Sequence, residues 1–360
     1  MSGGVDSSVT AALLHKAGHK VVGFTFRLWD EEYEQLTGLK GKADAAIIDA
    51  KKVSDHIGIR HEVLDLSEVF RQEVLERFER DYLAGVTPNP CVHCNPNIKF
   101  KSLWNAAQAH GLKNISTGHY ALVEHDPDGT PHLRRAVYLP KDQSYFLWQI
   151  PREILKRVIF PLASYTKPEV RKIAEEFGLP VAQKSESQEV CFVPNDDYRA
   201  WLLARSPKLV SGELSGEIYD RDGKKLSTHP GYPFFTIGQR KGLGLGGGRK
   251  YYVTSIDSET KRIYLGDRED LYSDTFRVGS VNKIRNLDFD GTQSFEVKIR
   301  YRDPGVQARV TINDDQTLTI KTDEPVSAVT PGQSAVIYLN DEVIAGGLIL
   351  RGDSNIPNSE

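Results

Sequence analysis

The sequence predicts an α/β amino-terminal domain with a doubly wound parallel sheet, followed by a small β-rich central domain and a carboxy-terminal β-barrel. Two observations support this fold class. In the first half, short β-type apolar runs alternate with helical patterns, as in a parallel sheet covered by helices. From about residue 206, glycine and tyrosine become more frequent and short alternating segments follow one another. We expect domains at 1–205, 206–268 and 269–352, with a frayed polar tail at 353–360.

The elements of the first half have ordinary start and stop signals. Helical spacing predicts helices at 8–17, 43–57 and 69–84, and the first two end at a glycine. Apolar β-type runs predict strands at 21–26, 61–66 and 115–117, and D-P-D-G within 124–132 predicts a hairpin tip. T-K-P-E at 166–169 supplies an N-cap, an early proline and a capping-box glutamate, so a helix should begin there and run to 177.

The second half predicts β-structure. A small β unit is expected from the runs at 251–256 and 262–265. The barrel strands are expected at 295–301, 307–311, 318–321, 334–338 and 344–350.

Composition excludes several protein classes. Of 360 residues, 26% are charged and 39% hydrophobic, and no apolar run approaches the roughly 18 residues that cross a bilayer. Three cysteines are too few for a disulfide framework, and no signal peptide is seen, so a reducing cytoplasm is expected. Met1 stands directly before a glycine loop that a strand should precede, and we expect the native start to lie upstream.

The run S-G-G-V-D-S-S at 2–8 predicts an anion site. Two glycines let the backbone approach an anion closely, and the amides of the following helix point toward it. No lysine follows the glycines, so the run is not the loop of phosphoryl-transfer NTPases. It resembles the pyrophosphate loop of N-type ATP pyrophosphatases. The candidate nucleotide-binding residues here are Ser2, Gly3, Gly4, Val5, Asp6, Ser7 and Ser8.

Cysteines form the second constellation. Cys91 and Cys94 form a C-x-x-C on a proline-stiffened turn, and Cys191 stands alone 97 residues after Cys94. A zinc site needs four ligands, so His93 or another histidine would have to join them. The pair can also be structural, or it can supply reactive sulfur as a nucleophile or as ligands of an iron–sulfur cluster. These interpretations stay open.

Further motifs suit a nucleotide or an RNA. T-G-H-Y follows the strand at 115–117, so it should lie at the carboxyl edge of the sheet, where ligands bind. K-D-Q-S-Y-F at 141–146 suits an unstacked base or a strand edge. Basic clusters at 240–241, 249–250 and 298–302 are ordinarily solvated, but together they favour a phosphate-backbone track.

The order of these motifs, with T-P-N-P-C-x-x-C-N-x-x-I-K-F, T-I-G-Q-R-K-G-L-G and V-T-P-G-Q-S-A-V, resembles that of tRNA-specific 2-thiouridylases. The resemblance covers essentially the whole chain. It implies an adenine nucleotide alpha hydrolase-like catalytic domain. It also implies an enzyme that adenylates the C2 oxygen of the wobble uridine in tRNA and replaces that oxygen with sulfur, releasing AMP and pyrophosphate.

The resemblance also implies roles for single residues. The loop would hold ATP and Mg²⁺, with Asp6 as the metal contact and Phe26 and Gly118 at the nucleotide. Cys191 would carry a persulfide delivered by a cysteine desulfurase or a relay protein, and Cys94 would be its partner nucleophile, ending in a Cys94–Cys191 disulfide. The residues implied to contact tRNA, the first three at the target base, are Asn89, Pro90, Cys91, His119, Lys141, Asp142, Gln143, Arg300, Tyr301 and Gln333.

Cys91 departs from the aspartate that many family members have at this position. Three thiolates with one open position are what a 4Fe–4S cluster binding an exogenous sulfide needs, so Cys91, Cys94 and Cys191 are alternatively cluster ligands. Another N-type ATP pyrophosphatase, such as an ammonia- or amino-acid-using ligase, and a non-enzymatic RNA-binding module remain as alternatives. A monomer is expected.

Overall fold

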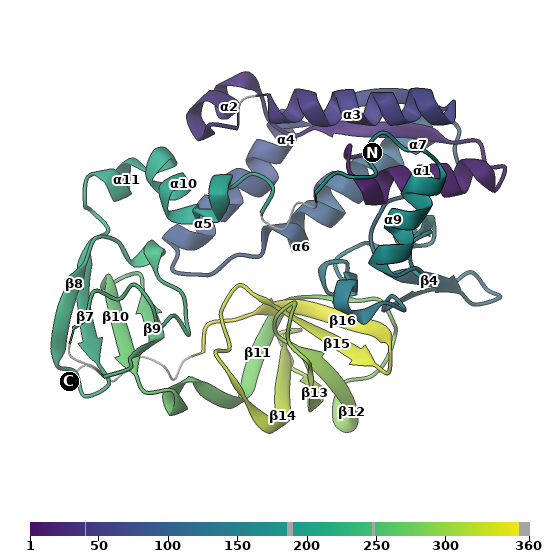
Figure 1. Cartoon of the computed structure of the whole chain (residues 1–360). Helices are drawn as coiled ribbons and strands as arrows, with labels where there is room; N and C mark the ends of the chain where they lie inside the picture. Colours follow the sequence, from purple (N-terminus) through teal and green to yellow (C-terminus); the bar gives the residue numbers. More distant parts are fainter. Residues whose placement is uncertain (40, 186–189, 247–248, 353–360) are drawn as a thin grey trace. The chain divides into compact units, whose positions relative to one another are not determined.

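The computed structural model describes residues 1–39, 41–185, 190–246 and 249–352, and the predicted tail at 353–360 lies outside them. The chain divides into two compact units (Figure 1). Unit 1 comprises Met1–Glu76, Pro90–Asp196 and Asp341–Ile344, and unit 2 comprises Arg77–Asn89, Asp197–Asn340 and Ala345–Glu360. In the part of the chain that is described, no helix is long and apolar enough to cross a membrane.

Unit 1 has the predicted parallel α/β arrangement. Strand β1 (Val22–Arg27) pairs in parallel with β2 (Arg60–Asp65), and β3 (Ile115–Ser116) pairs in parallel with β6 (Val158–Ile159), so the parallel strands form two separate pairs. The long helix α3 (Lys42–Ile57) lies against β1 and β2 (Figure 1). The predicted hairpin is formed by β4 (Leu122–His125) and β5 (Pro131–Arg134).

Helix α1 (Val5–Lys16) begins three residues earlier than the sequence predicted. Gly4 takes the N-cap position with extended backbone angles, and Asp6 in the first turn suits the positive end of the helix. The phosphate-type loop is therefore short, and four of its seven predicted residues already belong to helix α1.

The prediction of a turn around Cys91 and Cys94 is wrong. Both thiols lie on a helix, α6 (Pro90–Cys94), which continues as a π-helical turn (Asn95–Phe100) into α7 (Lys101–Ala109). Pro90 suits the first helical position. Pro96 lacks the N–H that an α-helix needs and would clash with the preceding turn, and the wider π turn accommodates it.

Most remaining helices of unit 1 are short. The helix predicted at 69–84 forms as one helical stretch from Ser67 to Leu83, in which the middle segment is a π turn. The capping box of α9 forms as predicted, because the Glu169 carboxylate accepts from the Thr166 amide at 2.7 Å. The helices are α2 (Glu31–Thr37), α4 (Ser67–Phe70), the π turn Arg71–Leu75, α5 (Glu76–Leu83, mostly in unit 2), α8 (Arg152–Leu155) and α9 (Lys167–Glu176).

Unit 2 contains α10 (Tyr198–Arg205), α11 (Pro207–Val210) and two β-structures. The central sheet has the order β8-β7-β10-β9, from β7 (Gly216–Asp220), β8 (Lys225–His229), β9 (Tyr252–Asp257) and β10 (Arg262–Gly266). The sequence predicted β9 and β10 but missed the β7–β8 hairpin.

Six described strands close a barrel in the order β11-β14-β13-β12-β15-β16, with β16 pairing back onto β11. The strand predicted at 295–301 ends at Lys298, so Arg300 and Tyr301 follow it in a turn. Strand β11 was missed because bulges break its alternation. The strands are β11 (Tyr272–Lys283), β12 (Asp290–Lys298), β13 (Val306–Ile312), β14 (Leu318–Ser327), β15 (Ser334–Leu339) and β16 (Glu342–Ile349).

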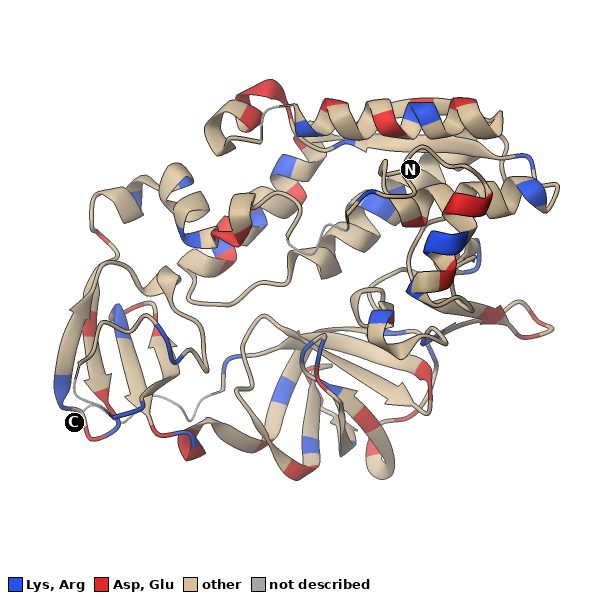
Figure 2. Ribbon diagram, viewed as in Figure 1, with Lys and Arg blue, Asp and Glu red and all other residues tan. Residues whose placement is uncertain are grey.

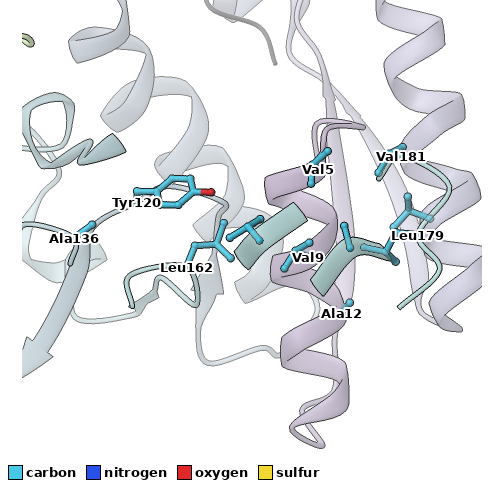
Figure 3. Packing of buried hydrophobic residues seen from close by; sticks show 11 residues of the cluster. Val5, Val9, Ala12, Tyr120, Ala136, Leu162, Leu179 and Val181 are labelled. Carbon is cyan, nitrogen blue, oxygen red and sulfur yellow. The ribbon is translucent and has the colours of Figure 1, made fainter. Parts of the chain in front are cut away.

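A buried cluster holds α1 in place beneath the glycine loop. Val5, Val9 and Ala12 of α1 pack with α9 and with Tyr120 and Leu162 (Figure 3). Val9 has no exposed surface. The orientation of the loop therefore depends on apolar packing one turn behind it.

Substituting Val9→Ala should lower the free energy of unfolding by about 2–3 kcal/mol, because two buried methyl groups are lost and a cavity remains. Urea denaturation measures the change. Val137→Ala is the control, since Val137 is 71% exposed and should change stability by less than about 0.5 kcal/mol. Equal stability of the two variants would contradict the packing described here.

Candidate functional site

The glycine loop is organised by its own serines. The Ser7 hydroxyl accepts from the Ser2 amide and donates to the Gly4 carbonyl, both at 3.1 Å, and Ser8 donates to the same carbonyl at 2.8 Å. The first helical bond of α1 runs from the Ser8 amide to Gly4. The amides of Val5, Asp6 and Ser7 consequently have no acceptor within the helix, which is the arrangement that binds anions.

Two glycines allow close backbone approach at this loop. Gly3 has a φ of +66°, and a Cβ there would lie 2.5 Å from the Ala46 carbonyl oxygen of α3. A Cβ on Gly118 would lie 2.8 Å from the Asp6 carbonyl carbon and from the Ser7 amide nitrogen. Gly118 therefore lies directly on the first turn of α1, which brings the T-G-H-Y motif to the glycine loop.

Asp6 joins the loop to two distant segments. Its Oδ1 accepts from the Tyr120 hydroxyl at 3.0 Å and from the Lys167 ammonium at 2.6 Å. The Lys167 ammonium also lies 5.9 Å from the centre of the Tyr120 ring. A second lysine, Lys184, donates to the Gly3 carbonyl at 3.0 Å and to Asp49 at 2.7 Å. These pairings could not be predicted from sequence patterns, because the partners are 114 to 181 residues apart.

The K-D-Q motif supports the T-G-H-Y motif. The Gln143 side-chain oxygen accepts from the Tyr120 amide at 3.0 Å, and the Gln143 amide donates to the Tyr120 carbonyl at 2.7 Å. Asp142 is buried, and its carboxylate accepts from Ala136 and Ser144. Burial raises the pKa of Asp142. In this structure the two residues hold the backbone that carries Tyr120, while Lys141 lies in a short 3₁₀ turn.

The three thiols come together in unit 1. Cys91 and Cys94 lie three residues apart on α6, so they share one face. Each sulfur lies close enough to influence another: Cys91 and Cys191 both raise the pKa of Cys94, and Cys91 raises that of Cys191. Cys191 is positioned by Phe192, whose ring packs edge-on against Phe70 and whose carbonyl accepts from the Tyr33 hydroxyl at 2.9 Å.

Burial keeps all three thiols protonated. It raises the pKa of Cys94 to about 12 and that of Cys191 to about 11, and it also raises the pKa of Cys91. Cys91 and Cys191 nevertheless expose part of their surface, whereas Cys94 is buried. The amides of Cys191 and Phe192 act in the opposite direction on Cys191 by favouring its thiolate.

Lys99, on the π turn, is a functional candidate that the sequence interpretation missed. Its positive charge lowers the pKa of all three thiols. It also lowers the pKa of His119, although burial is the larger cause and holds that pKa well below its ordinary value. The neutral His119 ring stacks on Phe100, and its Nδ1 shares a hydrogen bond with Thr117 at 2.7 Å. The I-K-F motif contained Lys99, but only the fold places it among the thiols.

Two metal-containing groups are implied for this chain, Mg²⁺ at Asp6 and an iron–sulfur cluster at the three cysteines. Asp6 keeps 33% of its side chain exposed, and a carboxylate oxygen suits Mg²⁺. Among the described residues, no three or more His, Cys, Asp or Glu side chains are grouped to hold a metal ion. The three cysteines thus do not form a cluster site in this structure.

Of the other predicted residues, Phe26 and Pro90 belong to unit 1, and Gln333 and Arg300 belong to unit 2. Phe26 lies near the carboxyl end of β1, and Pro90 begins α6. In unit 2, Gln333 donates to the carbonyls of Thr87 and Pro88, just before Asn89, and Arg300 lies 3.8 Å from Asp303.

Some basic residues of the predicted phosphate-backbone track form ion pairs within the protein, and others are exposed. Arg249 forms an ion pair with Asp267 at 3.0 Å, and acidic residues are interspersed with the basic ones on unit 2 (Figure 2). Arg240 and Lys241 are exposed.

Substituting Gly118→Ala should weaken ATP binding roughly 10- to 100-fold, because the added methyl group collides with backbone at Asp6 and Ser7 and displaces the loop. Isothermal titration calorimetry measures the affinity. Gly246→Ala is the matched control, since the space around Gly246 is open. Unchanged affinity in the Gly118 variant would show that the loop does not depend on this approach.

Alkylation of Cys191 should accelerate about tenfold per pH unit between neutral pH and pH 9.5, because its pKa is about 11 and only the thiolate reacts. Lys99→Met should slow the reaction at every pH in this range, since removing the positive charge raises the pKa further. Mass spectrometry after iodoacetamide pulses gives the rates. Lys101→Met, which removes an exposed lysine nearby, should leave them unchanged, and equal slowing in both variants would refute a specific effect of Lys99.

Family models match nearly the whole chain. A tRNA methyl transferase HUP domain model matches residues 1–195, and a tRNA methyl transferase PRC-barrel domain model matches residues 208–267. An aminomethyltransferase beta-barrel domain model matches residues 273–349. Together they confirm the predicted fold class: an α/β domain, a small β domain and a β-barrel.

Full-length relatives agree with these matches. The tRNA-specific 2-thiouridylase MnmA of Salinibacter ruber is 44% identical over 356 residues, which cover 97% of this chain and 92% of the relative. That of Pelobacter propionicus is 44% identical over 352 residues, covering 97% and 96%. A third, MnmA 1 of Caldanaerobacter subterraneus, is 42% identical over 357 residues, covering 97% and 96%. With thiols, glycine loop and all three domains present, this chain belongs to the tRNA-specific 2-thiouridylase MnmA family.

Proposed function

We propose that this protein is a tRNA 2-thiouridylase, a sulfurtransferase that replaces O2 of the wobble uridine with sulfur at the expense of ATP. The observation that carries the proposal is the convergence of Cys91, Cys94 and Cys191 in the unit that also holds the glycine loop. An adenylating loop alone would serve many ligases. Three interacting thiols in the same unit favour sulfur transfer.

In the first step, the loop amides and the Asp6 region hold ATP, and Mg²⁺ bound at Asp6 would offset phosphate charge. The uracil C2 oxygen attacks the α-phosphate and displaces pyrophosphate. The resulting O-adenylate makes that oxygen a good leaving group, as AMP. A wobble base can leave the anticodon stack without breaking a pair, so extrusion costs at most a few kcal/mol.

The second step transfers sulfur. A cysteine desulfurase or a relay protein delivers a sulfur atom that makes Cys191 a persulfide. Its terminal sulfur attacks C2 and expels AMP, leaving the base joined to Cys191 through an S–S bond. Cys94 then attacks the Cys191 sulfur, the S–S bond breaks with its electron pair going to the base, and 2-thiouridine leaves. A Cys94–Cys191 disulfide remains, and an external dithiol reduces it for the next turnover.

The remaining assignments complete the proposal. Asn89, Pro90 and Cys91 contact the target base, and His119, Lys141, Asp142, Gln143, Arg300, Tyr301 and Gln333 contact tRNA. Phe26 contacts the adenine. The enzyme acts as a cytoplasmic monomer, with domain boundaries as the sequence predicts. Methyl transfer, which the family models' descriptions mention, needs neither a pyrophosphate-type loop nor paired thiols, and an ammonia-using ligase needs no thiol.

Substituting Cys94→Ser or Cys191→Ser should abolish thiolation, because serine can neither carry a persulfide nor resolve one. Affinity for tRNA should stay within about twofold, since phosphate contacts dominate binding and no charge changes. Single-turnover assays with a persulfide donor and filter binding measure the two quantities. Full activity in either variant would refute this mechanism.

Cys91→Ser separates the two sulfur mechanisms. The persulfide route predicts that this variant keeps thiolating tRNA, whereas a route through a three-thiolate cluster predicts complete loss. Iron and sulfide assays on protein purified without oxygen accompany the comparison. Iron that tracks activity across the three cysteine variants would replace the persulfide route with the cluster route.

A further inference from the structure

We infer that Lys167 is a phosphate-binding residue of the nucleotide site, held beside the loop by Asp6 and transferred to the ATP phosphates when Mg²⁺ takes the Asp6 carboxylate. This inference rests on the proposed function, because it assumes that the glycine loop binds ATP. Nothing in the motifs assigned a ligand to Lys167.

The position of Lys167 is unfavourable for a merely structural lysine. It is the first residue of α9, where the positive end of the helix disfavours a cation. It is also only 7% exposed, and a buried ammonium needs a compensating partner. Asp6 is that partner, and a buried lysine kept at the start of a helix with its ammonium on a residue of the glycine loop indicates a function that the local fold does not explain.

The glycine loop next to Lys167 supplies no cationic side chain from its own residues. The loop carries no lysine or arginine between Ser2 and Ser8, and its donors are the amides of the first turn of α1 and serine hydroxyls. Neutral donors alone leave the triphosphate charge largely uncompensated. Lys167 brings a positive charge within 2.6 Å of Asp6, which lies two residues after Gly4.

The Asp6 carboxylate holds the Lys167 ammonium next to the loop before a nucleotide binds. A carboxylate at the mouth of a phosphate site repels the ligand unless a cation neutralises it, and in the structure Lys167 does so. A third of the Asp6 side chain stays exposed, so a hydrated Mg²⁺ can reach it. Mg²⁺ bound there would weaken the ion pair between Asp6 and Lys167, and the ammonium could then donate to phosphate oxygens of a nucleotide held by the same loop.

Lys184 has a different task. Its ammonium donates to the Gly3 carbonyl and to Asp49, so it fixes the loop backbone to α3. Lys172 offers the matched control on the same helix as Lys167. Its side chain is 76% exposed, and its partner is Glu176 at 3.7 Å.

The test is calorimetric titration of the full chain without tRNA, so that no turnover occurs. ATP and adenosine are each titrated with EDTA and with Mg²⁺, into wild type, Lys167→Met, Lys167→Arg, Asp6→Asn and Lys172→Met. We expect Lys167→Met to weaken ATP binding roughly 10- to 100-fold with Mg²⁺, because the phosphates lose a charged donor. In EDTA the variant should also bind ATP more weakly, because the Asp6 carboxylate is no longer neutralised and repels the phosphates. Adenosine binding should stay unchanged, because adenosine has no phosphate. Lys167→Arg keeps the charge and should stay within a few-fold of wild type.

The Asp6 variant tests the exchange. Asp6→Asn should retain ATP binding in EDTA, since the variant has no carboxylate at position 6 to compete with the phosphates for Lys167, but it should lose the gain that Mg²⁺ gives the wild type. Lys172→Met should match wild type throughout.

Two results would overturn the inference: unchanged ATP affinity in Lys167→Met, or an equal loss for ATP and adenosine, which marks a structural role. Wild type that binds no ATP would overturn the proposed function as well, so the two failures are distinguishable. Should Lys167→Met not fold, the comparison of Lys167→Arg with Asp6→Asn still decides, because a retained Mg²⁺ gain in Asp6→Asn contradicts the exchange.

Discussion

The Asp6 carboxylate is the contact through which three distant parts of unit 1 meet. One oxygen atom accepts from Tyr120, which follows β3, and from Lys167, which begins α9, while its own residue belongs to the first turn of α1. Gln143 in turn fixes the Tyr120 backbone from both sides. The K-D-Q, T-G-H-Y, T-K-P-E and glycine-loop motifs, scattered over 160 residues, thus form one hydrogen-bonded chain. Beneath it, the cluster around Val9 fixes the helix that carries the carboxylate.

Around the three thiols the structure favours neutral groups, whereas at Asp6 it holds a pair of opposite charges. Burial favours neutral sulfur, and the neighbouring thiols would repel one another as thiolates, so the resting state is protonated. Protonated thiols oxidise slowly, which protects a site exposed to cellular oxidants between turnovers. Lys99 and the amides near Cys191 lower the cost of forming a thiolate, and a bound substrate that shifts this balance would release the reactivity only when it is useful.

The sequence was sufficient wherever the information is local. The capping box of α9, the hairpin around Gly129 and the alternation of strands and helices depend on residues a few positions apart. The C-x-x-C helix was misread as a turn because two nearby prolines suggest one, while Pro90 starts a helix and Pro96 is absorbed by a π turn. Strand β11 was missed because its bulges interrupt the period. The lysines at the loop were beyond prediction, since their partners are joined only by tertiary packing.

The π turn at Asn95–Phe100 also determines the direction in which the side chains after Cys94 point around the helix axis. In a regular α-helix, side chains five residues apart differ by about 140° around the axis, which would point Lys99 away from Cys94. A π turn bonds each residue to the fifth one along and so brings such a pair toward the same face. Lys99 therefore lies near the three sulfur atoms because the π turn contains one residue more than an α-helical turn does. Deleting one residue of this turn would point Lys99 away from Cys94 and so remove its effect on the thiol pKa values, although all three cysteines would remain.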